Sequence, residues 1–315
     1  LPQDGRFATT VANKRIDVRV SSRPTVFGEK IVMRVLDKSR VIVSMDQLGL
    51  PNYISTALNT MLHVSRGLIA CVGATGSGKT TTLYAMLHRL RSEGVNIESV
   101  EDPVEYQLAG VNQAHVRPDI GLTFPVHLRS ILRQDPDVIL VGEIRDQETA
   151  EIAIQASLTG HLVFSTLHTN DAPSAFTRLV EMGVEPFLIS SSMLAALAQR
   201  LIRVLCPDCR TPDTPDPRIL AALDLESHKD QVFFKPSGCP HCLNTGYTGR
   251  QAVYEMLVVD EVIRELINKN TDSNTIKRTA RERGMRTLRE DAARRALRGQ
   301  TSLAEVVRVT QEDII

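Results

Sequence analysis

The stretch Gly73-Ala-Thr-Gly-Ser-Gly-Lys-Thr80 carries the clearest chemical signal of the chain. It fits the pattern G-x-x-x-x-G-K-[ST], in which backbone N–H groups of a glycine-rich loop surround phosphates and the lysine reaches the β- and γ-phosphates. A short apolar run, Leu68–Val72, predicts a strand before the loop, and a helical pattern follows it, as such a site requires. The sequence therefore predicts a nucleotide site, with the Thr80 hydroxyl on magnesium, formed by Gly73, Ala74, Thr75, Gly76, Ser77, Gly78, Lys79, Thr80 and Thr81.

Acidic residues follow two further predicted strands. The strand Val95–Val100 ends in Glu101-Asp-Pro-Val-Glu, and the strand Val138–Val141 ends in Gly142-Glu143. The carboxyl ends of parallel strands are where α/β folds bind their ligands. In P-loop ATPases the second of these strands runs beside the P-loop strand and carries an acid to Mg²⁺ and the attacking water. We therefore expect Glu143 to act where an aspartate is usual, whereas the acids at Glu101 also fit a solvated turn.

Two histidines bound the next predicted strand, at His161 and His168. A single histidine beside a strand is more often structural than catalytic, because its imidazole readily satisfies a backbone group. Two of them beside a nucleotide motif leave the catalytic and the structural interpretation equally open. His168 opens the segment His-Thr-Asn-Asp, where a γ-phosphate would be sensed.

Four of the five cysteines form two C-x-x-C pairs, Cys206–Cys209 and Cys239–Cys242. This arrangement suits a reducing compartment and a metal better than disulfides. Four thiolates form a closed tetrahedral zinc site, which has a structural and not a catalytic role. His241 could bind the metal in place of one thiolate. The fifth cysteine, Cys71, fits a buried apolar position.

The composition excludes some classes of protein. The chain has 315 residues, 42% of them hydrophobic, and its formal net charge is zero. A balanced net charge gives no electrostatic reason to expect a nucleic-acid partner, and no apolar run reaches the ~18 residues of a membrane span. No signal peptide is visible, and since the strand pattern is already under way at Leu1 we expect residues before it.

Alternating strand and helix patterns place these residues in an α/β fold with a parallel sheet. One amphipathic helix is predicted over Pro186–Leu205, and mainly helices follow from Asp260. We predict five regions, which are the C-terminal part of an N-terminal domain (1–38), a linker (39–49), the nucleotide-binding core (50–205), the tetracysteine subdomain (206–250) and a mainly helical C-terminal subdomain (251–315).

The P-loop, VEDPVEY at 100–106, LRQDPDVILVGEIRD at 132–146 and GHLVFSTLHTND at 160–171 together resemble the secretion ATPase superfamily. Within it, the chain is most similar to the motor ATPases of type II secretion and type IV pilus assembly. The resemblance implies a RecA-like P-loop ATPase core after the end of a smaller, PAS-like α+β domain. The tetracysteine insert favours secretion and pilus extension over retraction, and the ending TSLAEVVRVT favours type II secretion.

The resemblance also implies roles for individual residues. Glu101 matches a glutamate that activates water, and Glu143 matches an atypical Walker B glutamate that acts on Mg²⁺. His161 and His168 match a histidine box that couples the γ-phosphate to domain motion. Arg6 and Arg19 match arginines that, in this family, reach the phosphates from the N-terminal domain when that domain closes.

The function that the resemblance implies is Mg-dependent ATP hydrolysis by a homo-hexamer that drives pseudopilus assembly. It implies ATP, Mg²⁺ and Zn²⁺ as cofactors and a cytoplasmic location at the inner membrane. The expected partners are a membrane platform protein and a membrane-anchored docking protein, without nucleic acid. A pilus-extension motor is the close alternative. A DNA-uptake motor and a nucleotide-controlled interaction module are alternatives of other classes.

Overall fold

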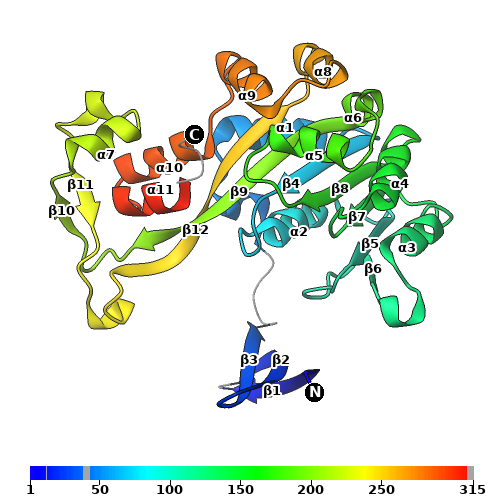
Figure 1. Cartoon of the computed structure of the whole chain (residues 1–315), viewed down its shortest axis with the longest axis horizontal. Helices are drawn as coiled ribbons and strands as arrows, with labels where there is room; N and C mark the ends of the chain where they lie inside the picture. Colours follow the sequence, from blue (N-terminus) through cyan, green and yellow to red (C-terminus); the bar gives the residue numbers. More distant parts are fainter. Residues whose placement is uncertain (12, 38–42, 311–315) are drawn as a thin grey trace. The chain divides into compact units, whose positions relative to one another are not determined.

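The computed structural model describes residues 1–11, 13–37 and 43–310 and divides into two units, Leu1–Val43 and Ser44–Ile315 (Figure 1). The first unit holds an antiparallel sheet in the order β1-β2-β3. Its strands are β1 (Gln3–Val11), β2 (Lys14–Thr25) and β3 (Gly28–Asp37).

Alternation along these strands separates two kinds of residue. One row of paired residues across the three strands is apolar and consists of Phe7, Val18 and Val35. The adjacent row consists of Arg6, Arg19 and Arg34. Because successive side chains point to opposite faces, one face is apolar and the other carries the arginines.

A seven-stranded sheet forms the centre of the second unit, in the order β12-β9-β4-β8-β7-β5-β6. All neighbours are parallel except β12, which is antiparallel to β9. The strands are β4 (Gly67–Val72), β5 (Ile97–Glu101), β6 (Asn112–His115), β7 (Val138–Val141), β8 (Leu162–Leu167), β9 (Met193–Leu205) and β12 (Tyr247–Val258). The strands β4, β7 and β8 are buried along their whole length, as the unbroken apolar runs of their sequences require.

Helices pack against this sheet and extend beyond it (Figure 1). Those of the core are α1 (Asn52–Met61), α2 (Lys79–Leu90), α3 (Phe124–Ile131), α4 (Gln147–Leu158), α5 (Ser174–Glu181) and α6 (Pro186–Ser192). The insert between the cysteine pairs holds β10 (Thr211–Asp213), α7 (Pro217–Ala222) and β11 (Phe233–Lys235), and the C-terminal helices are α8 (Glu261–Asn268), α9 (Ser273–Glu282), α10 (Leu288–Leu297) and α11 (Leu303–Thr310). Short 3₁₀ helices are η1 (Met45–Leu48), η2 (Pro118–Ile120), η3 (Glu226–His228) and η4 (Pro240–Cys242). Within the described ranges, no helix combines the length and apolar composition needed to cross a membrane.

The segment Pro186–Leu205 corrects a prediction. A single helix was expected, but the helix α6 ends at Ser192 and the 13-residue strand β9 follows at once. Met, Leu, Ala and Gln all favour helices, yet β9 lies between β4 and β12 and is mostly buried. Tertiary pairing overrides local propensity here, because burial on both faces rewards an extended apolar segment.

The neighbour of the P-loop strand also differs from expectation. Strand β7, which Glu143 follows by two residues, was expected beside β4, but β8 lies between them and pairs with both. Glu143 is therefore one strand farther from the P-loop, and the His168 end of β8 lies between the two. Strand order depends on long connections that no local pattern encodes.

Candidate nucleotide site and metal centre

The P-loop connects the end of β4 to the start of α2. A side chain at Gly73, where φ is +144°, would bring its Cβ within 2.5 Å of the Gln199 carbonyl oxygen. This position is therefore restricted to glycine by both conformation and space. The Lys79 ammonium lies inside the loop and donates to the carbonyls of Gly73 at 2.6 Å and Ala74 at 3.1 Å. Burial lowers the pKa of Lys79, and the nearby Cys71 and Glu143 oppose that shift.

A buried glutamine on the neighbouring strand fixes this loop. Gln199 of β9 donates from Nε2 to the Ser77 carbonyl at 2.9 Å and accepts from the Thr82 hydroxyl at 2.7 Å. The Ser77 hydroxyl is buried and has no partner among the described residues. An orphaned donor in a glycine-rich loop at a helix start fits a phosphate ligand. The loop thus suits the nucleotide that its sequence predicts.

Glu143 lies at the carboxyl end of β7, between the side chains of Arg145 and His168. Its Oε1 is 2.6 Å from an Arg145 guanidinium nitrogen, and its Oε2 is 3.5 Å from His168 Nε2. The preceding Gly142 would place a Cβ 3.1 Å from the Cα of Glu101 on the next strand, so a side chain at this point would press on β5. This contact explains why glycine stands where an aspartate is usual.

Glu101 lies in a buried cluster at the end of β5 and is only 4% exposed. It accepts hydrogen bonds from Tyr84, Ser99 and Gln113. Burial raises the pKa of Glu101, while these three hydrogen bonds oppose the rise. A carboxylate with a raised pKa is suited to accept a proton near neutral pH.

The two histidines lie at opposite ends of β8. His168 follows the strand at the edge where the P-loop and Glu143 lie, and it contacts Glu143. His161 precedes the strand, and its Nδ1 is 2.9 Å from the Ala156 carbonyl at the end of α4. Within this chain the two histidines are therefore about 20 Å apart, because a six-residue strand separates them, and His168 is the one at the P-loop edge.

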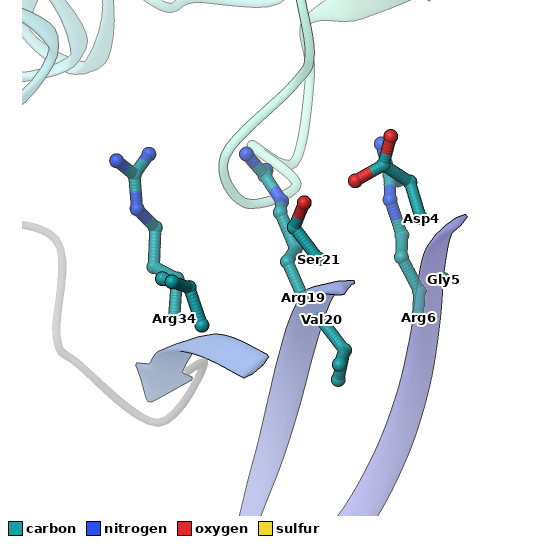
Figure 2. A pocket seen from close by; sticks show the side chains of 8 residues that line it. Asp4, Gly5, Arg6, Arg19, Val20, Ser21 and Arg34 are labelled. Atoms are coloured by element: carbon teal, nitrogen blue, oxygen red, sulfur yellow. The ribbon is translucent and has the colours of Figure 1, made fainter. Parts of the chain in front are cut away.

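Arg6 and Arg19 line one pocket of about 440 Å³ in the first unit. Arg34 completes the row, since Arg6 pairs with Arg19 and Arg19 pairs with Arg34 in the strand register. Figure 2 shows the three side chains extending the same way from neighbouring strands. Like charges in directly opposed positions repel, and an anion bound across the row would relieve this repulsion.

The sequence reasoning missed Arg34, although a signal was present. The turn between Thr25 and Gly28 fixes the register of the hairpin, and counting back from it sets Arg19 opposite Arg34. The hairpin turn and the two strands beside it thus set the position of the third arginine of the row.

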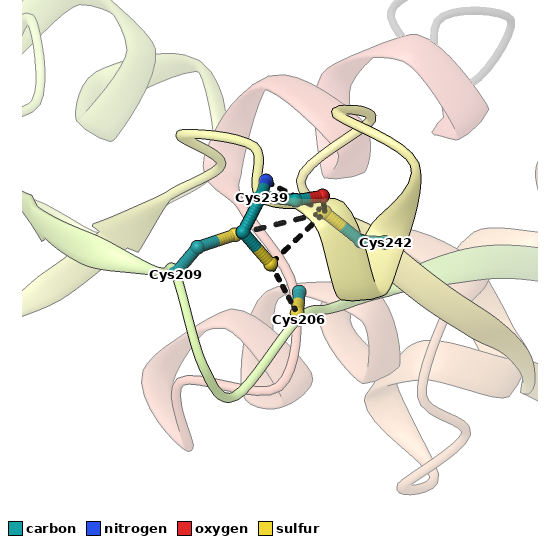
Figure 3. A group of neighbouring side chains, drawn as sticks. All are labelled: Cys206, Cys209, Cys239 and Cys242. Carbon is teal, nitrogen blue, oxygen red and sulfur yellow. Dashed lines mark hydrogen bonds between the residues drawn. The ribbon is translucent and has the colours of Figure 1, made fainter.

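The four paired cysteines converge in space, as their spacing predicted (Figure 3). The sulfurs of Cys206 and Cys239 are 3.8 Å apart, those of Cys209 and Cys242 3.8 Å, and those of Cys239 and Cys242 3.7 Å. A tetrahedral ion with Zn–S bonds of about 2.3 Å requires sulfurs about 3.8 Å apart, so the cluster has the size of a zinc site.

Backbone donors support the thiolate form of one of these ligands. The N–H groups of Cys239 and Gly246 donate to the Cys242 sulfur at 3.2 and 3.1 Å. Burial raises the pKa of Cys242, but these donors outweigh it and bring the pKa to about 6. His241, the alternative ligand, forms a hydrogen bond with Asp208.

Comparison with known proteins extends over nearly the whole chain. Type II secretion system protein E of Aeromonas hydrophila is 49% identical over 313 residues, which are 99% of this chain and 62% of that protein. Type II secretion system ATPase E of Vibrio cholerae is 46% identical over 312 residues, with the same 99% and 62% coverage. Type IV pilus assembly ATPase PilB of Thermus thermophilus is 47% identical over 314 residues, covering 99% of this chain and 35% of that protein. The chain thus spans less than two thirds of the length of these relatives.

The fold has a match among solved structures. The crystal structure of the pilus retraction motor PilT with bound ADP is 28% identical, with a TM-score of 0.69, and the match covers 98% of this chain and 77% of that one. The sequence profile of the family described as Type II/IV secretion system protein matches residues 1–308. The four motifs of the sequence, their arrangement in the sheet and these matches agree, and the chain belongs to the Type II/IV secretion system protein family.

Proposed function

We propose that this chain is the ATP-hydrolysing part of a motor for type II protein secretion, with a RecA-like core. The observation that carries the proposal is the meeting of the P-loop, Glu143 and His168 at one sheet edge in a chain that matches this family over residues 1–308. The relatives that match it at 49% and 46% identity are named for type II secretion.

In the proposed reaction the triphosphate lies against the P-loop. Lys79 gives up its carbonyl partners to contact the β- and γ-phosphates, and Ser77 donates its unpartnered hydroxyl. Mg²⁺, held by Thr80 with Glu143 close by, would neutralise phosphate charge. Glu101 accepts the proton of the attacking water, while His168 connects the γ-phosphate to the Glu143 carboxylate. His161 makes no phosphate contact in this proposal.

The arginine row of the first unit, Arg6, Arg19 and Arg34, has its own place in the proposal. We expect it to supply positive charge to the phosphates of a bound nucleotide, so that hydrolysis depends on the position of this unit. The three guanidinium groups on one face of the sheet support this expectation. A supplied arginine typically accelerates phosphoryl transfer about 10³- to 10⁵-fold.

The assembly and its surroundings are also part of the proposal. We expect a homo-hexamer on the cytoplasmic face of the bacterial inner membrane, which acts on a membrane platform protein to assemble a pseudopilus. A membrane-anchored docking partner would hold it there. Metal binding by the tetracysteine site, with zinc as the ion, is proposed from the sulfur spacing.

Pilus extension is the second candidate. The 47% identity to the Thermus pilus assembly ATPase equals the identity to one type II secretion relative, from Pseudomonas aeruginosa, and supports this more distant alternative. The two candidates share the same hydrolysis chemistry and differ in the membrane partner. Restoring secretion, or instead piliation, in a bacterium that lacks its own motor would distinguish them.

The test of the proposed activity is phosphate release by the full-length protein with Mg²⁺ and ATP. We expect Glu143→Gln to reduce kcat at least about 100-fold while a fluorescent ATP analogue still binds, since the change removes charge without changing shape. The matched control is Glu98→Gln, a half-buried glutamate three residues before Glu101 in β5, which should keep the parent rate. Equal rates for Glu143→Gln and the parent would refute the site, and no release by the parent protein would refute the activity.

A further inference from the structure

A buried polar cluster lies between the acidic segment 101–105 and the helix α2 that follows the P-loop. Its centre is the Glu101 carboxylate, and Tyr84 of α2 and Ser99 of β5 beside it are fully buried. Tyr84 donates its hydroxyl proton to Oε2 of Glu101, and Ser99 donates to Oε1 at 2.8 Å. Gln113 of β6 donates to the same Oε1 at 3.2 Å. Three elements thus supply one donor each to a single buried carboxylate.

The direction of each hydrogen bond follows from the partners. Gln113 accepts the Leu108 N–H through its Oε1 at 2.7 Å, so its Nε2 faces the cluster. That Nε2 also donates to the Tyr84 hydroxyl oxygen at 3.3 Å. Because the Tyr84 oxygen already accepts there, its own proton is available for Glu101. A phenol in this arrangement is a donor, and a carboxylate that receives three donors is favoured in its ionised form.

Among the described residues, no partner takes one acceptor position of the carboxylate. An ionised carboxylate offers about four lone-pair positions, and Tyr84, Ser99 and Gln113 use three of them. Both lone pairs of Oε1 are taken, so the remaining one is on Oε2, the oxygen that Tyr84 holds. The hydroxyl of Tyr84 therefore fixes the orientation of the one oxygen that can still accept a proton.

Tyr84 also ties this oxygen to the nucleotide site. It lies four residues after Thr80 in α2, so it is one helical turn from the residue expected to meet Mg²⁺ and on the same face. The ring of Tyr106, from the acidic segment, packs edge-on against the Tyr84 ring with centroids 4.6 Å apart. The helix that begins at the P-loop is therefore joined to the segment that carries Glu101 by two contacts of one side chain.

We propose that Tyr84 is a positioning residue for hydrolysis, which holds the Glu101 carboxylate ionised and directs its Oε2 to the attacking water. The inference rests on the proposed function and adds a residue to it. Glu101 takes one proton from the water as the water oxygen bonds to the γ-phosphorus. The bond from that phosphorus to the bridging oxygen breaks, and ADP and phosphate are the products. Tyr84 keeps its own proton throughout.

The test is the pH dependence of kcat for Tyr84→Phe in the full-length protein. Removing one donor from the ionised form raises its pKa, so the acid limb of the profile should move up by about one to two pH units. At a fixed pH on the acid limb kcat should fall about 10- to 100-fold, while the affinity for a non-hydrolysable ATP analogue stays the same. Tyr106→Phe is the matched control, because its hydroxyl makes no hydrogen bond to Glu101 within the described residues, and its profile should match the parent.

A double-mutant cycle separates a positioning role from a structural one. If Tyr84 acts only through Glu101, Tyr84→Phe should cause no further loss in a Glu101→Gln background. Ser99→Ala removes a second donor of the same carboxylate and should move the acid limb in the same direction. That variant decides the question if Tyr84→Phe does not fold.

The outcomes distinguish the role of Tyr84 from the proposed function of the chain. If the parent hydrolyses ATP and Glu101→Gln does not, but Tyr84→Phe keeps the parent profile, the role of Tyr84 is refuted and the proposed function stands. A faster Tyr84→Phe enzyme would also overturn it, because the hydroxyl would then restrain the base. If the parent protein releases no phosphate, the proposed function itself fails.

Discussion

At the scale of single residues, the end of the strand at which a side chain lies decides what it can reach. His161 and His168 hold equivalent positions in the sequence, because each stands directly beside one end of the apolar strand β8. Only His168 lies at the edge that carries the P-loop and Glu143, whereas His161 caps the end of α4 through Ala156. Two residues that the sequence treats alike therefore have different expected roles.

This difference predicts a contrast between two matched variants. His168→Ala should reduce kcat about 100-fold, because the imidazole that is proposed to connect the γ-phosphate to Glu143 is lost. His161→Ala should leave kcat within about threefold and lower the free energy of unfolding by about 1 kcal/mol, the usual value of one hydrogen bond. Steady-state phosphate release and urea unfolding measure the two effects. An inactive His161→Ala enzyme with normal stability would contradict this assignment.

Much of the site was accessible to residue-level reasoning, and the reason is chemical. The P-loop, Glu143 and the four cysteines are motifs whose residue types and spacing are set by the ligand. The P-loop joins a strand to a helix and the four cysteines converge, as expected, whereas Glu143 follows a strand that lies one strand farther from the P-loop than expected. The burial of Glu101 among Tyr84, Ser99 and Gln113 was not predictable, because these side chains come from three different elements that meet only in the folded sheet.

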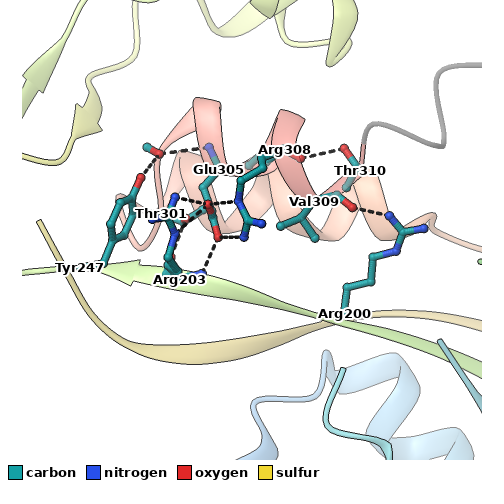
Figure 4. A network of polar contacts seen from close by, with 10 residues as sticks. Arg200, Arg203, Tyr247, Thr301, Glu305, Arg308, Val309 and Thr310 are labelled. Carbon is teal, nitrogen blue, oxygen red and sulfur yellow. Dashed lines mark hydrogen bonds and ion pairs between the residues drawn. The ribbon is translucent and has the colours of Figure 1, made fainter. Parts of the chain in front are cut away.

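At the scale of elements, one buried glutamate fastens the last helix to the sheet (Figure 4). Glu305 of α11 is 1% exposed and pairs with Arg203 of β9 at 2.7 Å and with Arg308 at 2.6 Å. Its Oε1 also accepts the backbone N–H of Arg203 at 2.9 Å. The Arg203 guanidinium in turn lies 4.0 Å from the centre of the Tyr247 ring, so β9, β12 and α11 meet at this point.

This anchor predicts a loss of stability in acid. Burial alone would raise the pKa of Glu305, but Arg308 and Arg203 lower it from 4.5 to about 2. Since the carboxyl binds its proton more weakly in the folded state, its contribution is complete above about pH 4.5 and is lost as the pH falls towards 2. The difference corresponds to about 3 kcal/mol of folding free energy.

Hydrogen exchange of residues 303–310 measures this effect where it occurs. Exchange should accelerate between pH 4.5 and 2, after correction for the intrinsic rate, more than in the strand β4. Glu305→Gln should show the same acceleration already at pH 7 and lose about 3 kcal/mol in urea unfolding. Glu93→Gln, an exposed glutamate, should change neither quantity. Unchanged protection of α11 in Glu305→Gln would show that packing alone holds the helix.

Elements were predictable where local pattern and burial agree. The strands β4, β7 and β8 are short apolar runs with polar ends and were expected at nearly these bounds. The strand β6 has the sequence Asn-Gln-Ala-His and no apolar pattern, because it lies at the edge of the sheet and is half exposed. The strand β6 forms because it pairs with β5, and a strand of this kind cannot be predicted before the tertiary fold is known.

At the scale of the whole molecule, the tetracysteine site should stabilise the insert and not the nucleotide core. We expect one zinc ion per chain, and chelation should speed hydrogen exchange across residues 206–246, because metal binding energy is folding energy for such a site. Exchange in β4 and α2 should stay slow, since their contacts belong to the seven-stranded sheet. Cys239→Ser should lose the metal, whereas Cys71→Ala should keep it, because Cys71 is buried in β4. Zinc content well below one per chain in the unchelated protein would refute the site.

The arginine row is the feature that makes the proposed motor depend on both units. If Arg6, Arg19 and Arg34 supply charge to the triphosphate, each single loss should slow hydrolysis without changing the fold of the second unit. For Arg34→Gln we expect kcat to fall about 10- to 100-fold, less than the ~10³–10⁵ of a lone arginine finger, because two guanidinium groups remain.

Arg23→Gln is the control, since Arg23 belongs to the same strand β2 but lies outside the pocket. Its kcat should match that of the parent. Relief of like-charge repulsion would also make the first unit of Arg34→Gln slightly more stable, by a few tenths of a kcal/mol. A variant that is both less active and no less stable can then be attributed to lost charge at the phosphates. Full activity of Arg34→Gln, with Arg6→Gln and Arg19→Gln also active, would mean that the row binds some other anion and that hydrolysis needs the second unit alone.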